Sequence, residues 1–428
     1  MVQIYDDWQI KTIGDLGDII TGGTPSSRNP ECFGDEYPFI TPSDIDGSSR
    51  YITTKRFLSE EGKENQIKRI LPRGSICFVC IGATIGKICM TKETSFTNQQ
   101  INSIIVNEHE YNNVFVYYLL CTMSETIKSI ASGAATPIVN KSLFSSVNIT
   151  VPSLSIQNRI AAILSAYDDL IENNLRRIKI LEEMAQALYR EWFVHFRFPG
   201  HEKVRLVDSP LGKIPEGWEA STLGDNIVAL ESGRRPKGGV TGIAEGIPSI
   251  GAENVIGIGK HDFSKERYVP HEFFDSLNKG VVKDGEVALY KDGANIGRST
   301  YFRDGYPYQK CCVNEHVFLI RATGDHLTQN MLYLWLREPE TVAQIRSKNT
   351  NAAQPGINQK AVRSLRIVVP PKYVVNEFDS LVESILGEIV YLANKNRVLQ
   401  CTRDLLLPKL ISGELDVSEL DIALPEDI

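Results

Sequence analysis

Two short segments place a cation directly after a pair of glycines, a pattern that could bring the backbone close to a phosphate. Residues 82–87 read GATIGK, and residues 293–298 read GANIGR. Glycines permit a tight turn, and the amides of such a turn can face an anion. The pattern is not a nucleotide-binding loop, because only three residues separate the glycines and no Ser or Thr follows Lys87. A purely structural turn between strands explains it about equally well.

Two polar loops precede these turns, one in each half of the chain. Residues 21–26 read TGGTPS, and residues 231–237 read ESGRRPK. The side chains of Arg234, Arg235 and Lys237 suit phosphate oxygens or guanine edges. A solvated loop without a ligand is the alternative.

A third pair of segments carries groups that can read the edges of bases. Residues 98–100 are NQQ and residues 314–316 are NEH, which supply amide, carboxylate and imidazole groups. Polar turns that satisfy their own hydrogen bonds are the alternative. The candidate DNA-contacting residues are Thr24, Ser26, Arg28, Thr84, Lys87, Asn98, Gln99, Gln100, Arg234, Arg235, Lys237, Lys291, Asn295, Arg298, Asn314 and His316.

An internal repeat indicates the elements that position these loops. The matching pairs include Trp8 and Trp218, Gly14 and Gly224, Asp15 and Asp225, Pro137 and Pro355, and Asn140 and Asn358. The offset grows from 210 to 218 residues along the chain, as expected when insertions accumulate in loops. The chain is therefore two similar modules in tandem. This organisation suits a protein that binds two similar ligands, or one ligand with two similar ends.

Catalytic signatures are missing from the sequence. It has no nucleotide-binding lysine motif, dinucleotide fingerprint, Asn-Pro-Pro-Tyr-type amino-methyltransferase motif, metal-spaced His/Cys set or Gly-x-Ser-x-Gly elbow. The repeated scaffold with varying polar loops favours recognition over catalysis, because catalytic groups would recur in both copies or stand out in one.

Composition places the chain among ordinary globular proteins. Its 428 residues are 42% hydrophobic and carry a net charge of −7, which argues mildly against holding nucleic acid by bulk electrostatics alone. No apolar run approaches the roughly 18 residues of a membrane span, and from the N-terminal residues we expect no secretion signal. The eight cysteines show no disulfide spacing, and Cys77-x-x-Cys80 has no second pair nearby. We expect buried, reduced cysteines, a cytoplasmic location and no membrane partner.

Each module has two expected parts. The first is β-rich with short helices: strands over 75–81, 101–106, 286–290 and 317–320, and helices over 111–130 and 328–345. The second is a long helix with apolar residues seven apart, which indicates a coiled-coil seam. The expected seam residues are Ile160, Tyr167, Asn174, Leu181 and Leu188 in the first helix and Phe378, Ile385, Leu392, Leu399 and Leu406 in the second. A neighbouring column holds Ile163, Leu170 and Met184. A single amphipathic helix lying on its own module is the alternative.

The sequence resembles the specificity subunits of type I restriction–modification systems over nearly its whole length. The likeness rests on the openings of both modules at 8–15 and 218–225, the two glycine turns, Val151-Pro152 with Gln157, and the helix ends at 191–194 (EWFV) and 403–415 (RDLLLPKLISGEL). One departure is that residues 371–375 lack the usual Gln after the second Val-Pro, which puts a role carried over from Gln157 in doubt.

The resemblance implies an α+β fold with two tandem β-rich target recognition domains, each followed by a long helix. The two helices pair as an antiparallel coiled coil. The expected parts are target recognition domain 1 (1–152), spacer helix 1 (153–199), a polar linker (200–217), target recognition domain 2 (218–370), spacer helix 2 (371–412) and an acidic tail (413–428). A straight helix over 155–189 would span about 52 Å, enough to hold two readers one DNA turn, about 34 Å, apart.

The resemblance also implies function. Each domain would read one half of a bipartite, asymmetric sequence in double-stranded DNA, and the helices would fix the spacing and dock two methyltransferase (modification) subunits. Those subunits bind S-adenosylmethionine, and restriction/translocase subunits use ATP and Mg²⁺ to cut DNA. This chain would have no catalysis, cofactor or metal of its own. The alternatives are a stand-alone DNA methyltransferase or nuclease with fused recognition domains, and a coiled-coil adaptor without a DNA role.

Overall fold

The computed structural model describes residues 8–45, 47, 49–132, 136–349 and 356–422. The chain forms two compact units, unit 1 with residues 1–172 and 398–428 and unit 2 with residues 173–397. Each unit contains one β-rich module and a part of each long helix. The N-terminal residues 1–7, Pro355 of the repeat and residues 423–428 of the acidic tail lie outside the described residues.

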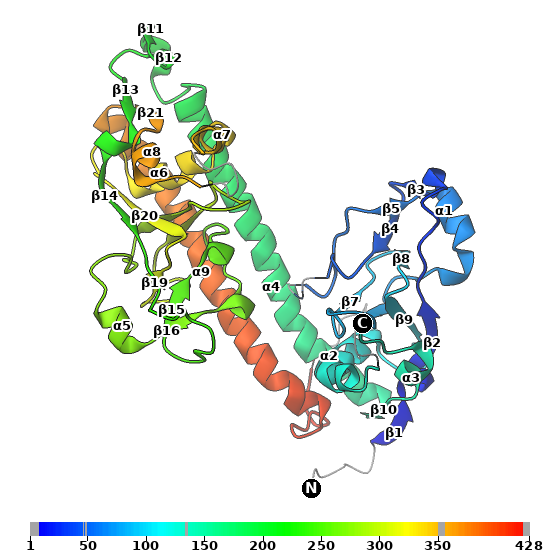
Figure 1. Ribbon diagram of the computed structural model, residues 1–428. Coiled ribbons are helices and arrows are strands. Elements are labelled where there is room, and N and C mark those ends of the chain that lie inside the picture. The colour runs from blue at the N-terminus through cyan, green and yellow to red at the C-terminus, as the bar shows by residue number, and fades with distance from the viewer. Residues whose placement is uncertain (1–7, 46, 48, 133–135, 350–355, 423–428) are drawn as a thin grey trace. The chain divides into compact units, whose positions relative to one another are not determined.

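Unit 1 is built on a four-stranded antiparallel sheet. Its strand order is β2 (Gly17–Thr21), β9 (Ile101–Val106), β6 (Ile76–Val79) and β7 (Ile88–Met90). A second sheet has the order β3 (Phe33–Gly34), β5 (Phe57–Leu58), β4 (Tyr37–Ile40) and β8 (Phe96–Thr97), and β1 (Gln9–Thr12) pairs with β10 (Asn148–Val151). The helices are α1 (Glu60–Asn65), α2 (Asn113–Ser129) and α3 (Lys141–Ser145), and α2 packs on β6 and β7 (Figure 1).

Unit 2 repeats this topology. The corresponding four-stranded sheet has the order β14 (Ile227–Ser232), β20 (Val317–Ala322), β17 (Glu286–Tyr290) and β18 (Ser299–Phe302). The smaller sheet contains β16 (Tyr268–Val269), β15 (Ile247–Ile250) and β19 (Cys312–Val313), and β13 (Glu219–Thr222) pairs with β21 (Arg366–Val369). The module's helices are α5 (His271–Asp275), α6 (Gln329–Leu336), α7 (Pro339–Ser347) and α8 (Gln359–Arg363). The repeat in sequence is thus a repeat in fold, as predicted.

Many of the repeated residues stabilise local backbone structure. The hydroxyls of Thr12 and Thr222 donate to the carboxylates of Asp15 and Asp225, closing the turn that follows the first strand of each module. Asn140 and Asn358 cap α3 and α8 by accepting a backbone N–H three residues on. These polar side chains recur because they fix the backbone.

Two expectations about local structure were wrong. The single helix expected over 328–345 is two helices, because the residue before Pro339 is extended, with φ −65° and ψ 136° at Glu338, and α7 starts at the proline. The polar linker expected over 200–217 contains the hairpin of β11 (Leu206–Ser209) and β12 (Gly212–Pro215), in which Ile214 is buried.

The side chains of Cys77 and Cys80 do not form a site together. Three positions apart on or beside β6, they point to opposite faces of the sheet and belong to different cores. Among the described residues no group of three or more His, Cys, Asp or Glu side chains gathers in a way that could hold a metal ion. The described residues also include no helix long and apolar enough to cross a bilayer.

The two long helices are α4 (Leu154–Tyr189) and α9 (Lys372–Ile411), and they pack antiparallel in each unit. Within unit 2, Nδ2 of Asn174 donates to Oδ1 of Asn396 over 2.7 Å, while the ring of Tyr189 lies 6.2 Å from that of Phe378. Within unit 1, Asp168 of α4 forms an ion pair with Arg403 of α9. As the residue numbers rise along α4, the numbers of their partners on α9 fall, which is the antiparallel arrangement.

The most deeply buried seam lies beside the predicted column. On the first helix and its continuation it consists of Leu164, Ile171, Ile178, Ala185 and Trp192, and on α9 it includes Val375, Val382, Ile389, Asn396 and Leu410. Of the predicted set, Ile160, Asn174, Phe378 and Leu392 are buried, and Tyr167, Leu181, Leu188, Ile385, Leu399 and Leu406 are half-buried. The neighbouring column was wrong for Leu170 and Met184, which are 47% and 51% exposed, whereas Ile163 is half-buried and packs on the core of unit 1. Small and polar residues occupy the seam, so apolar size alone misplaces it.

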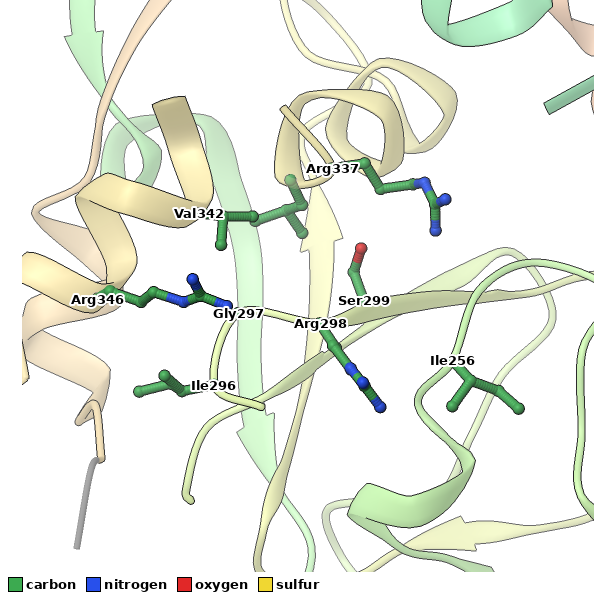
Figure 2. Close-up of a pocket in the computed structure, with 9 residues that line it drawn as sticks. Ile256, Ile296, Gly297, Arg298, Ser299, Arg337, Val342 and Arg346 are labelled. Atoms are coloured by element: carbon green, nitrogen blue, oxygen red, sulfur yellow. The ribbon is translucent and has the colours of Figure 1, made fainter. Parts of the chain in front are cut away.

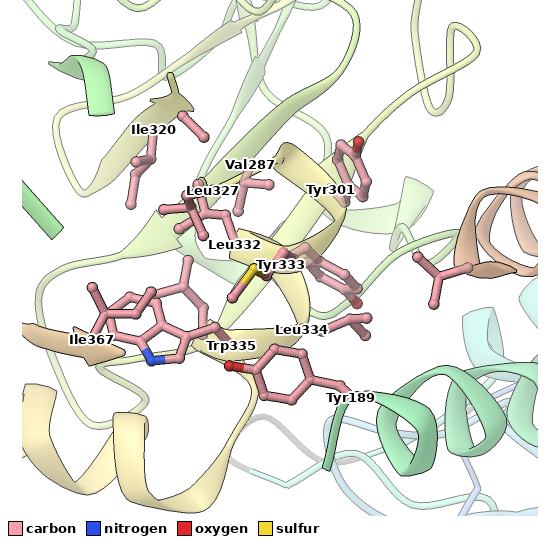
Figure 3. Packing of buried hydrophobic residues seen from close by; sticks show 14 of the residues in the cluster. Tyr189, Val287, Tyr301, Ile320, Leu327, Leu332, Tyr333, Leu334, Trp335 and Ile367 are labelled. Atoms are coloured by element: carbon pink, nitrogen blue, oxygen red, sulfur yellow. The ribbon is translucent and has the colours of Figure 1, made fainter. Parts of the chain in front are cut away.

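The core of unit 2 joins its module to both helices. Figure 3 shows Leu332, Leu334 and Trp335 of α6 in this core together with Tyr189 of α4.

Gln157, one of the residues on which the family resemblance rests, ties the start of α4 to the module of unit 1. It accepts the backbone N–H of Asn112 and donates to the carbonyl of Pro152. At the same place in the repeat, unit 2 has the fully buried Val375. At this position, where the sequence departs from the family pattern, unit 2 therefore has apolar packing in place of the hydrogen bonds that Gln157 makes in unit 1.

A buried histidine makes the stability of unit 2 sensitive to pH. His261 packs edge-on against the rings of Phe263 and Tyr308, and the guanidinium of Arg397 from α9 lies over both of those rings. Burial lowers the pKa of His261 to about 4; Arg397 adds to this effect and Asp262 opposes it. Glu266 is the other acid nearby, 3.8 Å from Nε2.

Because the folded pKa lies below the unfolded one, this stability is present above pH 6.5 and is lost as the pH falls toward 4. We expect protonation of His261 to lower the free energy of unfolding of unit 2 by about 2 kcal/mol between pH 7 and pH 5. Urea unfolding of the wild type and of His261→Phe, which cannot titrate, measures the effect. Equal pH dependence in the two proteins would contradict the assignment.

Candidate nucleic-acid interface

Three loops meet at one edge of the four-stranded sheet in unit 1. They follow the ends of β2 and β6 and precede β9, and these points coincide because β9 runs antiparallel to both neighbours. The N–H of Gly23 donates to the carbonyl of Thr97 over 2.9 Å, and the N–H of Cys80 donates to that of Gln100 over 2.7 Å. A side chain at Gly22 would meet the Asn98 carbonyl at 2.2 Å, so the close approach requires glycine. The three segments singled out in the sequence therefore form one surface.

The side chains on this surface of unit 1 are mainly neutral. Thr24 donates to Oε1 of the exposed Gln99 over 2.8 Å, which ties two of the loops together. Asn98 shapes its own turn, since its amide donates to Oε1 of Gln100 and its Oδ1 accepts the N–H of Gln100. Ser26 and Arg28 are exposed, and Thr84 is half-buried.

Lys87 has a structural task in unit 1. Its ammonium group donates to the carbonyls of Pro42, over 3.3 Å, and Ile45, over 2.5 Å. It therefore secures the loop after β4, and a contact with a phosphate would have to compete with these bonds.

The same three loops meet in unit 2. The hydroxyl of Ser232 donates to the carbonyl of Glu315, and the N–H of Lys291 donates to that of His316 over 3.1 Å. A side chain at Gly233 would lie 1.6 Å from the carbonyl oxygen of Val313, so glycine is again required. The two modules thus share one loop arrangement.

The surface of unit 2 is charged where that of unit 1 is neutral. Arg235 lies 3.0 Å from Glu315, whose carboxylate is also 3.3 Å from Nε2 of His316. Nδ1 of His316 lies 3.2 Å from Asp292, and the ammonium of Lys291 lies 3.9 Å from the same carboxylate. This row of alternating basic and acidic side chains presents both donors and acceptors, the groups that distinguish base edges.

The other candidates of unit 2 divide into fixed and exposed side chains. Arg234 lies over the ring of Phe273 and donates to the carbonyl of Ser276 over 3.1 Å. Asn314 is buried and accepts the N–H of His316, so it shapes the turn. Lys237, Asn295 and Arg298 are exposed, and so is Arg234 despite its contacts.

The structure adds cations that the sequence pattern did not single out. In unit 1 the guanidinium of Arg69 packs against the backbone of Gly23 and borders, with Lys68 and Lys141, a hollow of about 440 Å³ beside Thr21. In unit 2 Arg337 and Arg346 border a hollow of about 450 Å³ together with Arg298 (Figure 2). These residues come from distant segments, so no local motif announces them.

Comparison with known proteins agrees with this architecture. A family model described as the type I restriction modification DNA specificity domain matches residues 5–183 and 215–377. The type I restriction enzyme MjaIX specificity subunit of Methanocaldococcus jannaschii is 30% identical over 433 residues, which cover 98% of this chain and 96% of that protein. The HindI specificity subunit of Haemophilus influenzae is 38% identical over 182 residues, covering 41% of this chain and 39% of that protein.

A crystal structure of a type I restriction–modification S subunit from M. genitalium shares the fold. Its TM-score is 0.57 at 16% identity, with 95% of this chain and 97% of that chain covered. Both copies of the family domain fall on the two modules described above. The chain therefore belongs to the family of type I restriction–modification DNA specificity subunits.

Proposed function

We propose that the two modules each read one half of a bipartite, asymmetric DNA target through their three-loop surfaces. The observation that carries the proposal is that both sheets bring the same three loops together but furnish them differently. Neutral amides at Gln99 and Gln100 occupy the place that Glu315 and His316 occupy in the other module. Two recognition modules with the same fold and different side chains suit a target with two different halves.

The paired helices supply the second part of the proposal. A buried Asn–Asn bond in a coiled-coil seam favours one register, because any shift would leave amides buried without partners. A fixed register suits a spacer that sets the distance between the two half-sites, and the exposed faces of α4 and α9 are available to dock two methyltransferase subunits.

In this proposal the chain selects DNA and its partners do the chemistry. S-adenosylmethionine belongs to the methyltransferase subunits, and ATP with Mg²⁺ belongs to the restriction/translocase subunits. A net charge of −7 is compatible with this division if the partners supply much of the phosphate contact. A cytoplasmic location remains a prediction.

The test compares the chain alone with the chain assembled with its methyltransferase subunits. We expect the assembled complex to bind its target at least about 1,000-fold more tightly than scrambled DNA of equal length. The chain alone, given S-adenosylmethionine and DNA, should transfer no methyl groups. Methyl transfer by the chain alone, or an assembled complex without sequence preference, would refute the proposal.

A further inference from the structure

An arginine-lined hollow in unit 2 stands out against the acidic balance of the chain. Its walls come from the glycine turn after β17, from the end of α6 and from α7, and each contributes one guanidinium: Arg298, Arg337 and Arg346 (Figure 2). Its apolar wall includes Ile256 and Val342, and its volume is about 450 Å³.

The turn and α7 are held together by direct packing. Gly297 has φ +93°, and a side chain there would lie 3.3 Å from Val342 and 3.7 Å from Ile345. This close approach sets Arg298 at the rim of the hollow that Arg346 of α7 also borders. The same turn presents the exposed Asn295 at the three-loop surface.

The charges in this hollow are only partly balanced. Arg337 lies over the Tyr333 ring and 3.9 Å from Glu182, whose carboxylate also holds Lys260 at 2.6 Å. Among the described residues, the guanidinium groups of Arg298 and Arg346 have no ion-pair or hydrogen-bond partner. Guanidinium groups gathered around a concave site suit an anion with several oxygens, and phosphate is such an anion.

The equivalent hollow of unit 1 is built differently. The turn there also packs on a helix, since Ser124 of α2 donates to the carbonyl of Gly86 over 2.9 Å. Cys121 occupies the place of Arg337, and Lys87 is bound to carbonyls. Arg403 also lines the wall, but it is paired with Asp168 and Asp404, which line the wall beside it. The anion site is therefore a property of unit 2 and does not follow from the shared scaffold.

We infer that Arg298, Arg337 and Arg346 bind a backbone phosphate of the DNA at the half-site read by module 2. The inference rests on the proposed function, because it takes DNA to be the ligand of this surface. The contact adds affinity without adding sequence preference, since all nucleotides share the phosphate.

The experiment measures DNA affinity against salt concentration for the assembled complex, with both target and scrambled duplexes. The test variant is Arg298→Ala/Arg346→Ala, whose two side chains are exposed and whose loss should leave unfolding unchanged. The matched control is Lys203→Ala/Lys213→Ala, which removes two exposed charges before and within the β11–β12 hairpin. We expect about ten-fold weaker binding to both duplexes and a salt slope reduced by one to two in the test variant alone.

Several outcomes would overturn the inference. If the test variant has the same salt slope as the wild type, the inference is wrong. The proposed function still stands in that case, provided that the wild type prefers its target. An effect confined to one base pair would make Arg298 or Arg346 a base reader. Loss of a methyltransferase subunit during size-exclusion chromatography would make the hollow a protein-docking surface. If the wild type shows no target preference, the proposed function fails, whereas the slope on scrambled DNA still decides whether the hollow binds phosphate.

Discussion

Replacing Phe378 with alanine should lower the free energy of unfolding of unit 2 by about 3–5 kcal/mol. Phe378 is fully buried at the start of α9, and its ring lies 4.6 Å from that of Phe193 and 5.6 Å from that of Trp192. Alanine would leave a cavity where α9, the end of α4 and the second module meet, because the packed rings of Tyr189, Trp192 and Phe193 cannot all move to fill it.

Urea unfolding monitored by tryptophan fluorescence measures this change. Phe378→Leu keeps most of the volume and should cost less than half as much. Tyr391→Ala removes an aromatic ring from the same helix at a position that is 60% exposed, so it should cost under about 0.5 kcal/mol. Equal effects of Phe378→Ala and Tyr391→Ala would show that this aromatic cluster does not hold the helices.

Replacing Asp168 with alanine should destabilise unit 1 by about 3 kcal/mol, because it leaves a largely buried charge without its main partner. Asp168 is 12% exposed; it pairs with Arg403 of α9 and accepts the Tyr118 hydroxyl over 2.5 Å. Burial opposes the charge on Arg403, but the carboxylates of Asp168 and Asp404 together outweigh burial, so the pKa of Arg403 lies above its ordinary value. Burial also raises the pKa of Tyr118, which stays a neutral donor.

The matched control is the other acid beside the same guanidinium. Asp404 lies 2.8 Å from Arg403 but is 61% exposed, so Asp404→Ala should cost under about 1 kcal/mol. The double variant Asp168→Leu/Arg403→Leu should recover part of the loss, since it removes both charges. Similar midpoints for Asp168→Ala and Asp404→Ala in thermal unfolding would contradict this account of the contact.

The sequence predicted the repeated fold because its repeated residues are those that fix the backbone. Asp15 and Asp225 close the same turn, and Asn140 and Asn358 cap the same helix, so the pattern indicates equal topology. The single helix expected over 328–345 missed the break before Pro339, although the sequence carries a signal for it, since a residue that precedes proline disfavours the helical conformation.

Other features depend on contacts between distant segments, which no local pattern records. The three loops of each module meet only because of the strand order in the sheet. Ala185 lies in the helix seam while the larger Met184 is exposed, so apolar size is a poor guide to which face is buried. Lys87 was a candidate DNA contact in the sequence, but carbonyls more than 40 residues away accept hydrogen bonds from its ammonium group.

The central claim is that each module reads its own half of the target, and mapping of methylated sites tests it most directly. DNA modified by the assembled wild-type complex, by Arg235→Ala and by Gln99→Ala would be sequenced for methylated adenine. The wild type should mark one bipartite motif with a non-specific gap. Arg235→Ala should relax one half of it, at a cost of about 1–3 kcal/mol at one base pair, and Gln99→Ala should relax only the other half. Relaxation of the same half by both variants, or of both halves by either one, would contradict the account.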